Sequence, residues 1–331
     1  MKVVFFNLTK EEKNYFETNL SKDIVGYFYS ESFDSTYIPN NEIKDAEAIS
    51  IFVSGRIDAQ SLKKFPNLKY IFTRSVGFDH IGIDYCNSKN IKIYNAKHYG
   101  DNTIAEYTFA ILLSVIRNIP SAMSDVKAGK VKQTKYRGLE LHGKTLGIIG
   151  LGSVGRQVAK IAQGFSMNVI CYDIEVNPSY KFVSLDELFE KSDIITLHTP
   201  YSAETENIIN ASAFSKMKKG VVLVNTARGE LVDVDSLIEN LNNEKVLYVA
   251  SDVLECENIL HGNYKKDFCL SCVDKHCLQK FFLNNKLMNK SNVLVTPHIA
   301  YNTHEAVKRI LEITLKNIEN AKRGILDNVV N

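Results

Sequence analysis

The sequence has 331 residues, of which 45% are hydrophobic and 24% are charged. This is ordinary globular composition, and it is enough chain for about two domains. The formal net charge is only +2, which gives no basic surplus for binding nucleic acid or an anionic membrane.

Short apolar runs alternate with helical patterns along the chain. The first run, Val3–Phe6, is too short for the apolar core of a signal peptide and is typical of a strand. No apolar stretch approaches the roughly 18 residues of a transmembrane helix. With six cysteines and no secretory signal, we expect a cytoplasmic protein whose thiols are free.

The predicted strands follow in two sets. They are Val3–Phe6, Ile24–Tyr29, Ala48–Val53 and Tyr70–Thr73, and then Thr145–Ile149, Asn168–Cys171, Ile194–Leu197, Val221–Val224, Val246–Ala250 and Val293–Val295. Helical patterns lie between most of them. This βαβ alternation predicts an α/β protein with two doubly wound parallel sheets, each covered on both faces.

Two helices mark the expected domain crossings. Asn102–Asn118 is apolar on nearly every side, which predicts a fully buried helix. We expect Asn102 to be its N-cap, because Thr103 to Glu106 has the capping-box pattern. The last predicted helix, Thr303–Arg323, is expected to return to the first domain.

The segment after Thr145–Ile149 has the pattern of a dinucleotide-binding loop. Gly150, Gly152 and Gly155 form a G-x-G-x-x-G motif between a predicted strand and a predicted helix. The glycines would permit the tight turn, the approach of a pyrophosphate and close helix–strand packing, in that order. The N–H groups near Ser153 and Val154 would face the phosphates.

An acidic residue follows the next predicted strand. Asp173 stands where a carboxylate holds the ribose hydroxyls of the cofactor, and Ile174 and Glu175 come directly after it. A carboxylate repels a 2′-phosphate, and neither of the next two residues is basic. The sequence therefore favours NAD over NADP.

Four motifs occur in one order along the chain. They are Gly150-x-Gly152-x-x-Gly155, Asn225-Thr-Ala-Arg228, Ser251-Asp252-Val-Leu-Glu-Cys-Glu257 and Thr296-Pro-His298-Ile-Ala-Tyr301. In this order they resemble the D-isomer-specific 2-hydroxyacid dehydrogenases, and most closely the D-lactate dehydrogenase branch. The resemblance implies a flavodoxin-like substrate domain over 1–101 and 299–331, with a Rossmann-type NAD domain inserted over 102–298.

The chemistry of such a reaction needs three kinds of residue. A histidine can give and take the carbonyl proton near pH 7, and we assign this role to His298. An adjacent carboxylate, Glu257, would orient the ring and favour its charged form. The two-pronged guanidinium of Arg228 would hold the substrate carboxylate. The resemblance implies the same three roles.

Other positions come from the resemblance alone. For the substrate it implies the backbone amides of Val76 and Gly77, the aromatic residues Tyr99 and Tyr301, and Arg228 and His298. For the cofactor it implies, besides the glycine loop and Asp173, the residues Thr199, Pro200, Thr205, Thr226, Ala227, Arg228 and Asp252. It also implies a homodimer.

Several alternatives remain open from the sequence. The substrate could be a bulkier 2-oxo acid than pyruvate, or the protein could be an NAD-sensing interaction protein that resembles corepressors. A metal site could be formed by Cys269, Cys272, His276 and Cys277, with His261 nearby. Their spacing is not a standard zinc pattern, and the expected reaction needs no metal, so we expect none.

Overall fold

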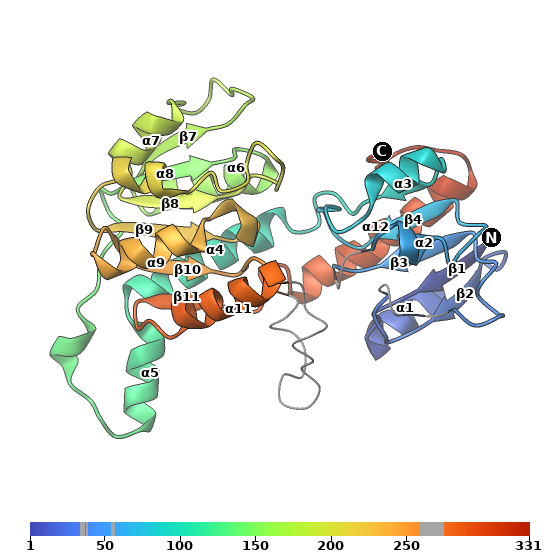
Figure 1. Ribbon diagram of the computed structural model, residues 1–331, viewed down its shortest axis with the longest axis horizontal. Helices are drawn as coiled ribbons and strands as arrows, with labels where there is room; N and C mark the ends of the chain where they lie inside the picture. The colour runs from blue at the N-terminus through green and yellow to red at the C-terminus, as the bar shows by residue number, and fades with distance from the viewer. Residues whose placement is uncertain (34–36, 38, 54–56, 258–274) are drawn as a thin grey trace. The chain divides into compact units, whose positions relative to one another are not determined.

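The computed structural model describes residues 1–33, 37, 39–53, 57–257 and 275–331. Its chain divides into two compact units, Met1–Tyr99 with Asn302–Asn331 (unit 1) and Gly100–Tyr301 (unit 2). Each unit contains one parallel β-sheet with helices packed against it (Figure 1). The predicted fold class, two parallel-sheet α/β domains, is therefore confirmed.

The sheet of unit 1 has five strands in the order β2-β1-β3-β4-β5, all of them parallel. Its strands are β1 (Lys2–Phe5), β2 (Val25–Phe28), β3 (Ala48–Ile51), β4 (Tyr70–Thr73) and β5 (Lys92–Tyr94). Its helices are α1 (Lys10–Asn19), α2 (Ala59–Leu62), α3 (Ile83–Ser88) and α12 (His304–Lys322). This strand order is that of flavodoxin-like sheets.

Helix α12 belongs to the core of unit 1, although it comes from the end of the chain. Its buried residues Leu311 and Ile318 pack in one cluster with Val3, Phe5 and Phe72 of the sheet. Thr303 caps the helix by accepting a hydrogen bond from the N–H of Ala306. The predicted return of the last helix to the first set of strands therefore agrees with this packing.

The sheet of unit 2 has six strands in the order β11-β10-β9-β8-β6-β7, again all parallel. They are β6 (Thr145–Ile149), β7 (Asn168–Tyr172), β8 (Ile194–Leu197), β9 (Val221–Asn225), β10 (Val246–Ser251) and β11 (Val293–Val295). On the free edge of β7, Cys171 forms an isolated parallel bridge with Phe182. In a Rossmann fold the third strand of the sheet lies beside the second, and this bridge occupies that place beside β7. With the bridge counted as the third strand, the strand order of unit 2 is that of a Rossmann fold.

The helices of unit 2, except α5, pack on the two faces of its sheet, over two apolar clusters. The helices of this unit are α4 (Asp101–Ile116), α5 (Ile119–Lys127), α6 (Ser153–Gly164), α7 (Leu185–Lys191), α8 (Ala211–Lys216), α9 (Val234–Asn242) and α11 (Lys275–Met288), with short 3-10 turns at Gln133–Tyr136 (η1) and Gly229–Leu231 (η2).

The predicted start of helix α4 is wrong. Its N-cap is Gly100, which makes no side-chain cap, and Asn102 lies inside the helix. Asp101 in the first turn accepts a hydrogen bond from Ser153 Oγ at 2.9 Å, and this contact with helix α6 accounts for the earlier start. The helix ends at Ile116, two residues before the predicted end at Asn118. Asn118 has a left-handed φ of +54°, which is typical of a residue just beyond the end of a helix.

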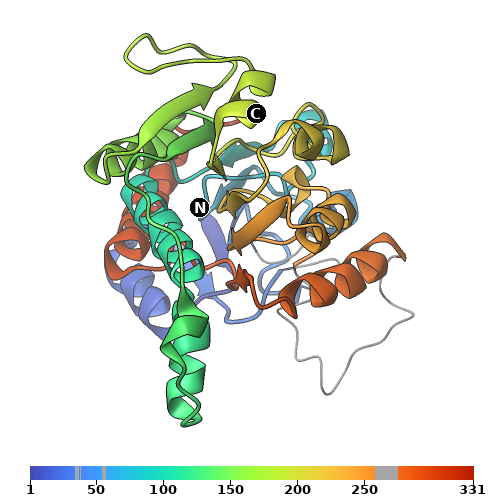
Figure 2. The ribbon, with the colours of Figure 1, turned by 90° about the vertical axis from the view of Figure 1, so that its left-hand side faces the viewer.

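Helix α5 extends from this end away from the sheet of unit 2, as Figure 1 and Figure 2 both show. None of its residues is buried. Among the described residues no single helix is long and apolar enough to cross a membrane, although α4 and α5, bent by 60° at their junction, pass that length and composition test together.

The expectation that the cysteines are free thiols is wrong for two of them, because Cys256 and Cys277 form a disulfide. Cys86 and Cys171 are free and buried. Burial raises the pKa of each of these two thiols to about 11, which makes them poor nucleophiles. Cys269 and Cys272 lie outside the described residues.

Candidate active site

The candidate residues of unit 2 follow the carboxyl ends of its strands. Gly150 follows β6, Asp173 follows β7, Thr199 comes after β8, Arg228 comes after β9, Asp252 follows β10 and His298 comes after β11. In a parallel sheet these ends lie along one edge, which is where α/β proteins bind their ligands. The topology therefore gathers residues that are far apart in the sequence.

The glycine loop has the geometry that its motif predicts. Gly150 has a φ of +93°, and a Cβ there would lie 2.6 Å from the backbone carbon of His198. A Cβ at Gly155 would lie 2.1 Å from the carbonyl oxygen of Gly150, whereas one at Gly152 would meet nothing within 4 Å. The first and third glycines are required by the protein's own packing, and the second leaves space beside the N-terminus of α6 for a phosphate group.

Asp173 is hydrogen-bonded to this loop. Its Oδ2 accepts from the N–H of Leu151 at 2.5 Å, and its Oδ1 accepts from the N–H of Glu175. The carboxylate is thus fixed beside the glycine turn, where a ribose would follow a bound pyrophosphate. Open space at Gly152 and an acid at the end of the next strand fit an NAD molecule.

His198 lies behind the glycine loop. Its Nε2 is 2.9 Å from Thr196 Oγ1, and burial lowers its pKa to about 3. The ring is therefore neutral at physiological pH. Its neighbours Thr199 and Pro200 begin the loop after β8, and Thr205 Oγ1 closes that loop by donating to the Pro200 carbonyl at 2.7 Å.

The segment between β9 and η2 is held by Asn225. Its Oδ1 accepts from the N–H of Ala227 at 3.0 Å, and its Nδ2 donates to the carbonyl of Arg228 at 2.7 Å. Thr226 is buried, with its hydroxyl 3.0 Å from that of Thr108 in helix α4. Asn225 therefore sets the turn from which the Arg228 side chain emerges.

The structure brings His298 and Glu257 together. His298 Nδ1 and Glu257 Oε1 form a hydrogen-bonded ion pair, and Glu257 Oε2 accepts from the N–H of Leu254 at 3.2 Å. The two side chains keep 24% and 26% of their surface exposed. With Nδ1 occupied by the carboxylate, Nε2 is the ring nitrogen available to exchange a proton with a substrate.

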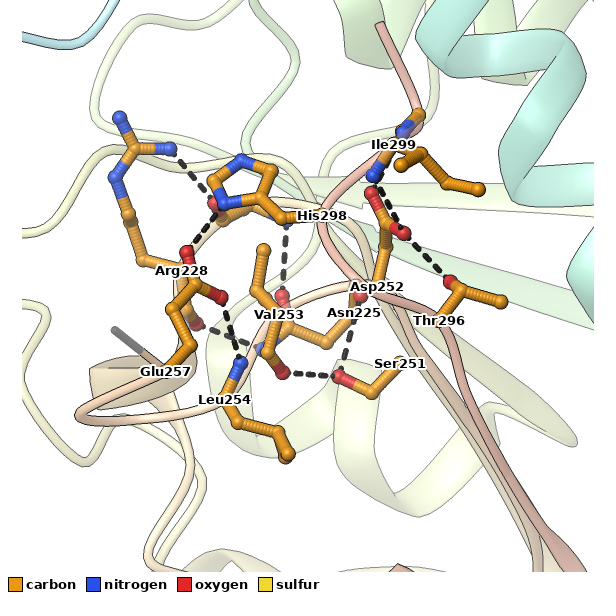
Figure 3. A network of polar contacts seen from close by, with 12 residues as sticks. Asn225, Arg228, Ser251, Asp252, Val253, Leu254, Glu257, Thr296, His298 and Ile299 are labelled. Atoms are coloured by element: carbon orange, nitrogen blue, oxygen red, sulfur yellow. Dashed lines mark hydrogen bonds and ion pairs between the residues drawn. The ribbon is translucent and has the colours of Figure 1, made fainter. Parts of the chain in front are cut away.

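Arg228 lies beside this pair. Figure 3 shows its guanidinium and the imidazole of His298 on the same side of the loops that carry them. Its Nη1 donates to the carbonyl of Ala227 at 2.8 Å. A fork of cationic donors next to an imidazole is an arrangement that can bind a carboxylate and protonate a neighbouring oxygen.

Asp252 holds the turn that carries His298. Its side chain is fully buried, and it accepts hydrogen bonds from Thr296 Oγ1 and from the N–H groups of Ile299 and Ala300 at 2.5, 3.0 and 2.7 Å. The backbone of His298 is left-handed, with a φ of +54°. Such a conformation is costly for a side-chain-bearing residue, and the Asp252 contacts are what maintain it.

The remaining substrate candidates lie at the corresponding edge of unit 1, except for Tyr301, the half-buried last residue of unit 2. Val76 and Gly77 follow β4, and their carbonyls accept from Asn95 Nδ2 and Ser75 Oγ at 2.7 and 2.6 Å. Tyr99 is buried, and its carbonyl accepts from Arg309 Nε.

Sequence reasoning gave no role to several residues that hold this site. Asn225 is one of them, although it heads the motif that contains Arg228. Another is Glu255, in the segment before Glu257. It contacts Lys280 and Asn284 of helix α11, which are also among the missed residues. No motif marks the last two, because their position depends on how α11 packs.

The cysteine and histidine residues considered as a metal site, where we expect no metal, fall partly outside the described residues, namely at His261, Cys269 and Cys272. Of the others, His276 pairs with Glu255 and Cys277 is in the disulfide. Among the described residues no group of three or more histidine, cysteine, aspartate or glutamate side chains could hold a metal ion.

Comparison with known proteins identifies the family of this site. Residues 109–300 match the family described as D-isomer specific 2-hydroxyacid dehydrogenase, NAD binding domain. A solved structure of D-lactate dehydrogenase from Aquifex aeolicus, complexed with NAD and lactic acid, is 36% identical; the match covers 99% of this chain and 98% of that one, with a TM-score of 0.87.

Two curated relatives carry other names. D-3-phosphoglycerate dehydrogenase from Archaeoglobus fulgidus is 37% identical over 88% of this chain, which spans only 52% of that relative's length. Aromatic 2-oxoacid reductase from Clostridium sporogenes is 34% identical, and the match covers 83% of each chain. These relatives are therefore named for different acids.

Proposed function

Because the chain belongs to the D-isomer-specific 2-hydroxyacid dehydrogenase family, we propose that it reduces pyruvate to D-lactate with NADH. The cofactor is NAD, for which residues 109–300 are the binding domain. The observation that carries the proposal is the ion pair of His298 with Glu257 beside Arg228. The 36% identity to a D-lactate dehydrogenase over nearly the whole chain supports the choice of substrate.

His298 is the proton donor in this proposal. Its Nδ1 is held by Glu257, so Nε2 gives its proton to the oxygen of the substrate carbonyl as that oxygen gains negative charge. The carboxylate of Glu257 stabilises the positive charge that the ring carries before the transfer. In the reverse direction the neutral ring takes the proton back from the hydroxyl.

Arg228 holds the substrate carboxylate and so aligns the carbonyl with His298. We assign the N–H groups of Val76 and Gly77 to the same carboxylate. Their carbonyls are tied to Asn95 and Ser75, which holds this backbone in one orientation. Tyr99 and Tyr301 are proposed to line the pocket.

NADH, when bound, supplies the hydride. We propose that the backbone at Gly152, Ser153 and Val154 binds its pyrophosphate, and that Asp173 binds a ribose. Thr199, Pro200 and Thr205 would contact the adenine side, while Thr226, Ala227 and Asp252 would lie near the nicotinamide. Gly150 and Gly155 keep the loop in the shape that this requires.

A bulkier 2-oxo acid is the second candidate substrate, because a relative 34% identical to this chain is named an aromatic 2-oxoacid reductase. The test is NADH oxidation with pyruvate, 2-oxoisocaproate, phenylpyruvate, hydroxypyruvate and glyoxylate, with NADPH as the cofactor control. We expect the highest kcat/KM with pyruvate. A preference for phenylpyruvate would contradict the lactate proposal, and NADH binding without any turnover would favour a sensor.

Replacement of the proposed proton donor tests the mechanism directly. His298→Ala should lower kcat by about 10²–10⁴-fold, because it removes general acid–base catalysis, and should leave the Kd for NADH nearly unchanged. Arg228→Lys should lower kcat/KM for the 2-oxo acid far more than it changes NADH binding, because an ammonium lacks the planar fork. Wild-type turnover in His298→Ala would refute the assignment.

A homodimer is part of the proposal, and helix α5 is the surface that supports it. Ile119, Met123 and Val126 on this helix are 42%, 54% and 63% exposed. Exposed apolar side chains gathered on one projecting helix are typical of a protein–protein interface.

A further inference from the structure

Helix α11 is joined to the segment before Glu257 by three different kinds of bond. Cys277 forms the disulfide with Cys256. Lys280 Nζ lies 2.9 Å from Glu255 Oε2. Asn284 Nδ2 donates to the Glu255 carbonyl at 2.9 Å. The helix makes one more contact with Glu255, between His276 Nε2 and Glu255 Oε1 at 2.6 Å. All four contacts fall on the two residues directly before the proposed catalytic carboxylate.

The ion pair in this set is nearly buried. The side chains of Lys280 and Glu255 are 12% and 13% exposed, and that of Asn284 is 1% exposed. Taking two charges out of water costs free energy that their attraction only partly returns. Such a pair contributes little to net stability. Removing Lys280 would leave the nearly buried Glu255 carboxylate with only the contact from His276, whose side chain is 58% exposed, and the loss of the buried partner favours movement of the segment.

The contacts on Glu255 and Cys256 restrict Glu257 through the backbone that joins these residues. Cys256 has a left-handed φ of +56°, a conformation that an ordinary side-chain-bearing residue keeps only when its surroundings hold it. One residue later, the Glu257 carboxylate is shared between the N–H of Leu254 and the ring of His298. A change at Glu255 or Cys256 therefore reaches the acid–base pair within one or two residues.

We propose that Lys280 and Cys277 are positioning residues, through which helix α11 holds Glu257 against His298, and that reduction of the Cys256–Cys277 disulfide loosens this hold. A dithiol would supply two electrons and two protons, the sulfur–sulfur bond would break to give two thiols, and the dithiol would itself become a disulfide. The proposal rests on the proposed function, because it assumes that Glu257 supports His298.

The predicted consequence is a change in pH dependence. A Glu257 carboxylate that is less well placed stabilises the charged ring less. His298 then loses its proton at a lower pH. The pH at which kcat/KM for 2-oxo acid reduction falls on the alkaline side should therefore be lower by roughly 0.5–1 pH unit. A loss of folded protein alone would lower the whole profile without moving it.

The experiment measures this profile, with NADH and the best 2-oxo acid, for Lys280→Met, Cys277→Ser and the double variant. Each single variant should shift the alkaline limb downward. The double variant should shift it by less than the sum, because both changes act on one segment. Lys280→Arg should restore most of the wild-type profile. Lys286→Met is the matched control, since Lys286 is exposed on the same helix, and should leave the profile unchanged.

Reduction with dithiothreitol is a second test of the connection between the Cys256–Cys277 disulfide and the pH profile. Wild-type enzyme treated with it should acquire the profile of Cys277→Ser, and peptide mapping should show loss of the Cys256–Cys277 cross-link. Cys277→Ser itself should not respond, which separates this disulfide from any effect at the other cysteines. NADH affinity, measured for every sample, reports whether the protein is still folded.

The outcomes separate this inference from the function on which it rests. Unchanged profiles in Lys280→Met and Cys277→Ser, with a shifted profile in Glu257→Gln, would overturn the positioning role alone. An unchanged profile in Glu257→Gln would overturn the proposed acid–base pair. A response of Cys277→Ser to dithiothreitol as large as that of the wild type would overturn the redox part.

Discussion

At the residue scale, His198 supports the glycine loop from behind, although we do not expect it to contact a ligand. His198 is half-buried next to Thr196, and its backbone lies against Gly150. Burial keeps its ring neutral by lowering the pKa to about 3. This single residue therefore connects the packing of the nucleotide loop with the pH dependence of stability.

The His198 ring predicts acid sensitivity. Its folded pKa of about 3 lies below the ordinary value of 6.5, so between these values the unfolded chain binds a proton that the folded chain excludes. The contribution of His198 to the free energy of unfolding should be constant above about pH 6.5. It should fall as the pH drops toward 3, by at most about 1.4 kcal/mol per pH unit.

Urea unfolding at about pH 7 and pH 5 measures this effect. His198→Gln keeps a hydrogen-bonding group near Thr196 but cannot be protonated. The loss of unfolding free energy between the two pH values should therefore be smaller in the variant by about 1–2 kcal/mol. The same loss in both proteins would mean that His198 is not the responsible group.

Two glycines of helix α6 give a matched pair of substitutions. A Cβ at Gly155 would lie 2.1 Å from the Gly150 carbonyl, whereas one at Gly164 would meet nothing within 4 Å. We expect Gly155→Ala to weaken NADH binding by about tenfold or more, because the loop must open by a distance that backbone atoms cannot absorb. Gly164→Ala should leave the Kd unchanged. Fluorescence titration with NADH tests both, and equal affinities would contradict this reading of the motif.

At the element scale, the sequence predicted the strands better than the ends of the helices. Buried parallel strands are continuous apolar runs, so Tyr70–Thr73, Thr145–Ile149, Ile194–Leu197 and Val293–Val295 agree with the structure residue for residue. Strand β5 was missed, because Lys92 interrupts the apolar run of Lys92–Tyr94. The start of α4 was wrong, because the contact of Asp101 with Ser153 depends on the tertiary fold.

Helix α5 was not predicted as a separate element, although it supports the dimer proposal. Met123→Lys would place a charge in the middle of its exposed apolar side chains. We expect this change to shift the protein from dimer to monomer in sedimentation analysis, because burying an unpaired charge in an interface is costly. Ser124→Lys is the matched control, because it adds the same charge at an exposed position on another face of the helix, and it should leave the dimer intact. A dimer unchanged by Met123→Lys would place the interface elsewhere.

At the scale of the whole molecule, the sequence located the parts of the site that lie in motifs and missed those that depend on packing. Arg228, Glu257 and His298 were each found from a local pattern, and the structure brings the last two into contact. The disulfide was not expected, because Cys256 and Cys277 are separated by 21 positions and no motif pairs them. Lys280 and Asn284 were missed for the same reason.

The division of unit 1 between the two ends of the chain has a consequence for synthesis on the ribosome. Residues 1–99 emerge first, but the helix that covers Val3, Phe5 and Phe72 does not emerge until after residue 303. Unit 2 is complete by Tyr301, before that helix exists. These residues are made before unit 2 but reach their native packing only after it is complete, and during that interval their apolar face is open to chaperones or to aggregation.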